Sequence, residues 1–142
     1  MYYTGMKYKH ITTAVLEELF KRAKDTAIQY SLNGPKGARA GGMGASLYTA
    51  EKNFFEGKNA QVDCGFGWCA EQAALMTAVT HNQPKVSALC IIADHGRLLS
   101  PCLKCHAFFR HVDRDNKKAL VVLGDKKILT LEDCLAQKEF YC

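Results

Sequence analysis

No segment of the 142-residue sequence is apolar over the length needed to span a membrane, and residues 1–7 lack the apolar core of a secretory signal peptide. Low-complexity runs, repeats of fixed period and linker-like stretches are also absent. These absences predict a cytoplasmic protein with no membrane partner. Because the chain is long enough for one hydrophobic core and too short for two, we expect a single domain over residues 1–142.

A strong excess of one charge is missing as well, since 19 Lys and Arg residues against 14 Asp and Glu give a net charge of +5. The lysine pairs at 117–118 and 126–127 are scattered, with aspartates among them. A solvated basic surface explains this pattern better than a nucleic-acid footprint, which needs a continuous basic stripe. We therefore expect no nucleic-acid partner.

Cysteine, by contrast, is plentiful. The chain has seven cysteines, an odd number, and no export signal. In that setting thiols and metal ligands are more frequent than a disulfide framework.

The first half of the chain has the pattern of a helix followed by a hairpin. Apolar residues recur at helical spacing over residues 11–30, and Thr12 or Thr13 could cap the start. A Gly- and Ala-rich loop is expected over 33–42, then a strand over Met43–Thr49, a turn, and an antiparallel strand from Phe54.

In the second half, helical and strand patterns alternate. We expect helices from Cys69 to about Val79, from Pro101 to Phe109 and over 131–137, with strands over 86–93 and 119–123. The apolar run at 86–93 is typical of a strand buried on both faces. The alternation predicts an α/β fold of three layers, α/β/α, with a mixed, mostly parallel central sheet.

Two cysteine motifs coincide with two of these expected helix starts. They are Cys69-Ala70-Glu71 and Pro101-Cys102-Leu103-Lys104-Cys105. Cys102 and Cys105 are three apart, so they share one helix face and could chelate one ion together with Cys69. Three thiolates leave a tetrahedral zinc with an open position for water, and Glu71 is suited to carry that water's proton.

A structural zinc site would need a fourth ligand instead of an open position. Cys64, His106 and His95 are the candidates, and we expect Cys64 to be a wall or core thiol. Cys90 lies within an apolar run and is interpreted as a core residue.

With these motifs the chain resembles the cytidine deaminase superfamily, and within it the small nucleoside deaminases that hold zinc with three cysteines. The resemblance covers residues 11–135 and is most specific at the two cysteine motifs. Residues 44–47 are similar to the family's first strand, and residues 57–61 to its sugar-binding segment. It implies one zinc per chain on Cys69, Cys102 and Cys105, with Glu71 as the catalytic proton carrier.

The resemblance also implies a substrate and its contacts. The expected reaction is hydrolytic deamination of cytidine or deoxycytidine to the uracil nucleoside and ammonia, as in pyrimidine salvage. The Ala70 N–H would bind the carbonyl oxygen of the base, and the Ser100 carbonyl would accept a hydrogen bond from the exocyclic amine. Asn59 and Gln61 match positions that contact the ribose. Members of the family usually form homotetramers, so a tetramer is expected here.

The sequence departs from the family pattern around the substrate. Gln61 stands where relatives carry a carboxylate, Gln72 where many carry an arginine that offsets thiolate charge, and Gly41, with Arg39 nearby, where relatives place a stacking phenylalanine. Lys104 could replace that arginine, and the stacking aromatic could be Phe66, Trp68 or one of residues 140–141.

These departures make a modified cytosine nucleoside, such as blasticidin S, the second candidate substrate. A polynucleotide deaminase is a third interpretation, although such relatives commonly use histidine as the first metal ligand, where this chain has Cys69. A zinc-stabilised binding module without catalysis is the alternative from another functional class.

Overall fold

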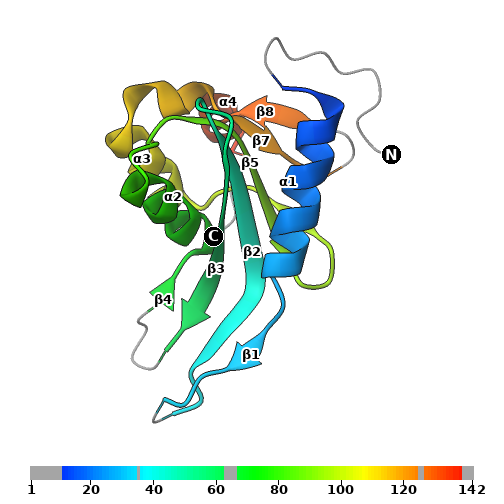
Figure 1. Ribbon diagram of the computed structural model, residues 1–142, viewed down its shortest axis with the longest axis vertical. Coiled ribbons are helices and arrows are strands. Elements are labelled where there is room, and N and C mark those ends of the chain that lie inside the picture. Colours follow the sequence, from blue (N-terminus) through cyan, green and yellow to red (C-terminus); the bar gives the residue numbers. More distant parts are fainter. Residues whose placement is uncertain (1–10, 35, 63–66, 125–126, 139–142) are drawn as a thin grey trace.

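The structure is a computed structural model that describes residues 11–34, 36–62, 67–124 and 127–138, and it is built on one sheet (Figure 1). The strands follow the order β4-β3-β2-β5-β7-β8, with β1 paired to β2 and β6 paired to β5. Their bounds are β1 Tyr30–Ser31, β2 Arg39–Thr49, β3 Phe54–Gln61, β4 Gly67–Trp68, β5 Val86–Ala93, β6 Leu98–Leu99, β7 Leu120–Val122 and β8 Ile128–Thr130. The helices are α1 Thr13–Thr26, α2 Ala70–Thr80, α3 Leu103–Val112, the 3-10 helix η2 Arg114–Lys118 and α4 Leu131–Ala136.

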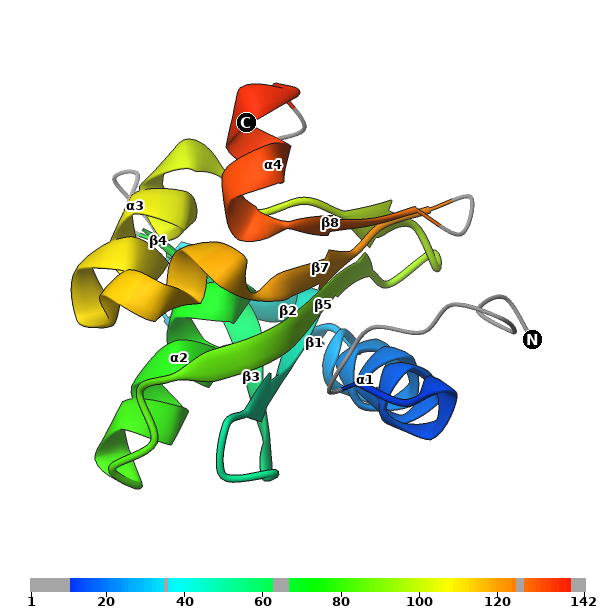
Figure 2. The same ribbon diagram turned by 90° about the horizontal axis from the view of Figure 1, so that it is seen from above.

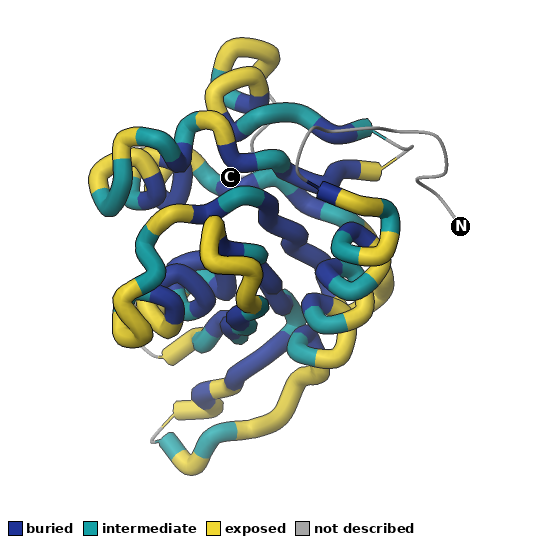
Figure 3. The backbone as a smooth tube through the Cα atoms, turned by 45° about the horizontal axis from the view of Figure 1, so that its top comes forward, coloured by how far each residue is buried: buried dark blue, intermediate teal, exposed yellow. Residues whose placement is uncertain are grey.

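The central strand β5 divides the core into two halves. Leu89 and Ile91 pack in the cluster that contains residues of α2, α3 and α4, whereas Cys90 and Ile92 pack with α1. Figure 2 shows α1 on one side of the sheet and the other helices on the opposite side. Buried backbone is concentrated along β5 and the adjoining part of β2 (Figure 3). The three-layer α/β/α architecture and the doubly buried strand are confirmed.

Helix α1, which covers one face of the sheet, is shorter than predicted. Thr12 caps α1, and its hydroxyl oxygen accepts a hydrogen bond from the Val15 N–H at 3.3 Å. The side chains of Leu16, Leu19 and Ala23 on α1 are buried. Full burial of a leucine side chain contributes about 1.5–3 kcal/mol to the stability of the folded state. The helix ends at Thr26, four residues before the predicted end, because the chain turns to form β1.

Gly57 of β3 determines how closely α2 packs against the opposite face of the sheet. A Cβ at Gly57 of β3 would overlap the backbone of Ala70 and Ala74 in α2. The absence of a side chain therefore lets the first turn of α2 lie directly on the sheet. This close packing fixes the position of the residues at the start of α2 relative to the sheet.

The sheet is mixed, but the prediction that it is mostly parallel was wrong. Among the described strands, only β5 and β7 pair in parallel. The strands that the sequence pattern missed, namely β1, β4, β6 and β8, are two or three residues long and pair antiparallel. Short connections such as the one from β7 to β8 permit only antiparallel pairing.

Two predicted boundaries also differ. The expected glycine-rich loop over 33–42 becomes strand from Arg39 onward, with an irregularity between Ala40 and Gly44 where Gly41 and Gly42 have φ of 90° and 91°. Pro101 precedes the cap residue of α3 and is not its first helical residue. No helix in the described ranges has the length and apolarity to cross a membrane.

Candidate metal centre

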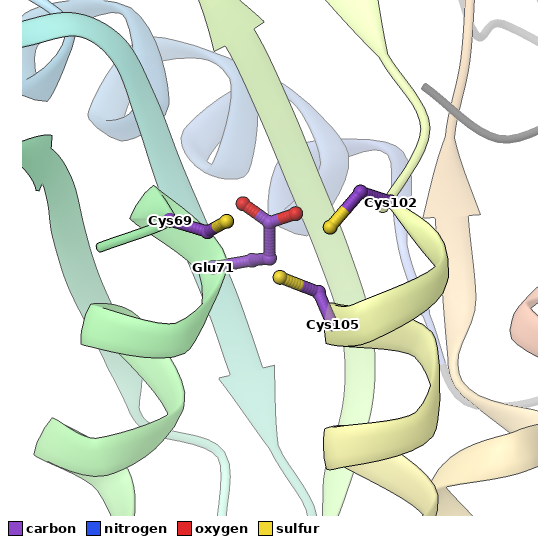
Figure 4. Close-up of side chains that lie close together, drawn as sticks. All are labelled: Cys69, Glu71, Cys102 and Cys105. Carbon is purple, nitrogen blue, oxygen red and sulfur yellow. The ribbon is translucent and has the colours of Figure 1, made fainter. Parts of the chain in front are cut away.

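Two helices deliver four side chains to one point. Cys69 and Glu71 come from the start of α2, and Cys102 and Cys105 from the start of α3 (Figure 4). The three Sγ atoms and a carboxylate oxygen all lie within 4.8 Å of one another. The predicted convergence of the three thiols is therefore present in the structure.

The helix caps explain how the sulfurs come together. Cys69 is the N-cap of α2, and its backbone N–H donates to Oε1 of Gln72 at 3.4 Å, as in a capping box. Cys102 is the N-cap of α3, and Cys105 lies in the first turn. Both sets of free helix N–H groups adjoin the sulfurs, so both helix dipoles favour negative charge there.

The role of Gln72 was missed by the sequence reasoning, which noted only that no arginine stands there. Its side chain is 6% exposed and is held by the Cys69 N–H. A polar residue three positions after a helix cap is a signal that could have identified it.

Glu71 is a buried carboxylate, with 6% of its surface exposed. Burial raises its pKa above the ordinary value, while backbone hydrogen bonds at Glu71 and Cys102 and the charge of Lys104 act in the opposite direction. Within the described part of the chain, Glu71 forms no ion pair. A buried, unpaired carboxyl beside three thiols is suited to exchange protons.

Two of the thiols, those of Cys69 and Cys105, are difficult to ionise without a cation. Burial raises the pKa of Cys69 and that of Cys105, and the neighbouring Glu71 charge adds to both shifts. The donor set fits zinc, because sulfurs bonded to one zinc at about 2.3 Å lie roughly 3.8 Å apart. Such an ion would neutralise the repulsion among these groups and favour the thiolates.

The candidate fourth ligands lie elsewhere or outside the described residues. His106 is buried, but its Nε2 atom contacts the Leu131 carbonyl oxygen, and His95 is exposed in the turn after β5. Neither belongs to the cluster. Cys64 is outside the described residues, as are Phe66 and residues 140–141. Cys90 is fully buried, as expected for a core residue, and this burial raises its pKa to about 12.

Two of the residues predicted to contact substrate lie close to the cluster along the chain, and the other two line a cavity. Ala70 is the first residue of α2, and Ser100 follows β6 two residues before Cys102. Asn59 and Gln61 line a cavity of about 250 Å³. Trp68, in β4 directly before Cys69, is 51% exposed. The contacts of these residues with a substrate stay predictions.

Removing the metal should make stability depend on pH in a defined direction. With Glu71, Cys69 and Cys105 all raised in pKa, the metal-free folded state retains protons that the unfolded state releases. The free energy of unfolding of metal-free protein should therefore fall as pH rises above the ordinary carboxyl value of 4.5, and further above the ordinary thiol value of 9.0. Added zinc should stabilise more as pH rises, because it binds deprotonated thiols.

Urea unfolding with and without zinc at about pH 5, 7, 9 and 10 measures this effect. A metal-free Glu71→Gln variant is the control, and it should lose the part of the dependence that begins near the carboxyl value. Stability of the metal-free protein that rises over this range relative to the variant would contradict the assignment.

Comparison with known proteins yields fold relatives only. No protein-family model matches the chain, and no curated protein sequence matches it. A point mutant of cytidine deaminase from Mycobacterium tuberculosis is similar in structure, with a TM-score of 0.71 at 20% identity, covering 89% of this chain and 98% of that one.

Two further structures agree with this result. Cytidine deaminase from Mycobacterium leprae has a TM-score of 0.69 at 16% identity, covering 84% of this chain and 96% of that one. Cytidine deaminase from Burkholderia pseudomallei has a TM-score of 0.66 at 21% identity, covering 87% and 95%. The chain therefore has the cytidine deaminase fold, as its cysteine motifs predicted.

Proposed function

We propose that this protein is a zinc-dependent deaminase of a cytosine nucleoside, converting cytidine or deoxycytidine and water to the uracil nucleoside and ammonia. The observation that carries the proposal is the buried Glu71 carboxyl among three converging thiols. The fold supports it, because the similar structures are cytidine deaminases.

The three thiols would hold one zinc per chain, and the ion would supply Lewis-acid activation of a water molecule. Glu71 would accept a proton from that water as its oxygen bonds to the carbon that bears the amine. It would then give this proton to the ring nitrogen, take a second proton from the hydroxyl group formed on that carbon and pass it to the amine, which leaves as ammonia while the carbonyl forms. A carboxyl whose pKa is raised by burial can both accept and return a proton near neutral pH.

Backbone groups at the same two helix starts would orient the base. The Ala70 N–H would donate to the carbonyl oxygen of the base, and the Ser100 carbonyl would accept from the exocyclic amine. An acceptor at that point favours the amine of the substrate over the oxygen of the product. Asn59 and Gln61, which line the cavity of about 250 Å³, would contact the sugar.

A modified cytosine nucleoside such as blasticidin S is the second candidate substrate. The observation that favours it is a hydrogen bond within the protein: the Oε1 atom of Gln61 accepts from Arg39 Nε at 2.8 Å. A neutral amide already engaged in this way binds a ribose hydroxyl less strongly than a free carboxylate would.

We also propose that the protein acts in the cytoplasm as a homotetramer. Trp68, Met76 and Leu103 are large apolar side chains on β4, α2 and α3 that are 51%, 39% and 45% exposed. Apolar residues of this kind are frequent in interfaces between subunits.

A substrate panel tests the proposed reaction. Purified zinc-loaded protein should deaminate cytidine, deoxycytidine or blasticidin S, measured by the change in ultraviolet absorbance, with free cytosine, adenosine and guanine as comparison compounds. Faster deamination of single-stranded oligonucleotides than of any nucleoside would favour a polynucleotide deaminase instead. Absence of turnover on every compound, together with four protein ligands on the zinc, would favour a structural site.

Replacing Glu71 separates the proton carrier from the metal ligands. Glu71→Gln should retain one zinc per chain and lower kcat by about 10²–10⁴-fold, because the amide can neither accept nor return the proton. Metal analysis and steady-state kinetics measure the two quantities, and Glu51→Gln, in the exposed turn after β2, is the matched control. Near-normal turnover in Glu71→Gln would remove this residue from the mechanism.

A further inference from the structure

A cavity of about 250 Å³ is lined by residues of β2 and β3, by the end of β5 and by the turn that follows it. Met43 and Ala93, two of its lining residues, pack in the core cluster that contains residues of α2, α3 and α4. Two of its lining residues lie near the metal ligands along the chain or across a strand pair. Leu99 lies three residues before Cys102, and Gln61 pairs with Gly67, two residues before Cys69. Three residues of extended chain span at most about 10 Å, so these lining residues lie near Cys102 and Cys69, and we expect a nucleoside whose base is at the centre to place its sugar in this cavity.

The cavity is rich in hydrogen-bond donors. The Oδ1 atom of Asn59 accepts from the Met43 N–H at 3.0 Å, and the Oε1 atom of Gln61 accepts from Arg39 Nε at 2.8 Å. Both amide oxygens are therefore engaged by the protein. The amide nitrogens form no hydrogen bond within the described ranges, so the two side chains have donors left for a ligand.

Two arginines add positive charge at the same cavity. Arg39 and Arg97 both line it and are exposed, and neither forms an ion pair with a carboxylate among the described residues. The Arg39 guanidinium is held by Gln61, while the Arg97 backbone is fixed by its carbonyl oxygen, which accepts from the Ala93 N–H at 2.8 Å. One carboxylate, Asp94, also lines the cavity, and its Oδ1 atom lies 3.4 Å from Nδ1 of His95.

Sugar hydroxyls both donate and accept hydrogen bonds, so a neutral ribose does not require a lining with this excess of donors and arginines. An oxyanion only accepts, and planar guanidinium groups match a phosphate or carboxylate in pairs of hydrogen bonds. An anionic group on the sugar would accept hydrogen bonds from these amide and guanidinium donors.

We propose that the nucleoside bound here carries an anionic oxygen group on its sugar, a phosphate or a carboxylate, and that Arg97 and Arg39 bind this group. The inference rests on the proposed function for the cytosine base, and it specifies the class of substrate. Relatives carry at the position of Gln61 a carboxylate that can accept from a sugar hydroxyl. In this chain Gln61 is hydrogen-bonded to Arg39, so the position presents a positively charged donor instead.

Calorimetric titration of zinc-loaded Glu71→Gln protein tests binding without turnover. The probes are cytidine 5′-monophosphate, cytidine 5′-carboxylic acid and cytidine. Each anionic probe should bind at least about tenfold more tightly than cytidine, and the tighter of the two identifies the anion as phosphate or carboxylate. The preference should decrease with added salt, because the arginines are exposed.

Arg97→Gln in the same background should remove the tenfold preference and leave cytidine affinity within about twofold. Arg114→Gln, a change at an exposed arginine of η2 outside this cavity, is the matched control and should retain the preference. Equal affinity of the charged and neutral probes, or an equal loss for all three probes in Arg97→Gln, would overturn the inference.

Turnover by the wild-type protein distinguishes this failure from failure of the proposed function. Deamination of cytidine without preference for the charged probes would uphold the proposed function and overturn the anion site. Arg97-dependent binding of the charged probes without deamination of any cytosine compound would uphold the anion site and overturn the proposed function.

Discussion

The site depends on bringing three sulfur atoms and one carboxyl together at the starts of two helices. Burial raises the pKa of Glu71, Cys69 and Cys105 and so opposes their ionisation. A bound cation would stabilise the ionised thiols. The fold supplies the geometry, because Gly57 lets α2 lie on β3 and because β5 and β6 lead the chain to the start of α3.

The same arrangement separates two tasks among similar groups. Thiols at helix N-termini are stabilised as anions and suit a metal ion. Glu71, two residues after Cys69, is buried without an ion pair in the described structure, which suits the proton-carrying role that we propose for it. The cavity that we propose for the sugar lies between β3 and the turn after β5, and its lining includes two arginines, two side-chain amides and the carboxylate of Asp94.

Local patterns in the sequence predicted much of this centre. A helix start is encoded within a few residues, so the α2 and α3 starts and the apolar strand β5 could be expected from Cys69, Cys102 and residues 86–93. The short strands could not, because two or three residues carry no periodicity, and this produced the wrong expectation of a mostly parallel sheet. The pairing of Arg39 with Gln61 depends on an irregular register beside Gly41 and Gly42, which only the assembled sheet reveals.

X-ray absorption spectroscopy of the zinc-loaded protein tests the central claim most directly. The account predicts three sulfur ligands at about 2.3 Å and one light oxygen or nitrogen ligand, with the light ligand retained in Glu71→Gln because the carboxyl is not needed to hold the metal. Four sulfur ligands, or a folded protein that binds no zinc at micromolar concentration, would contradict it.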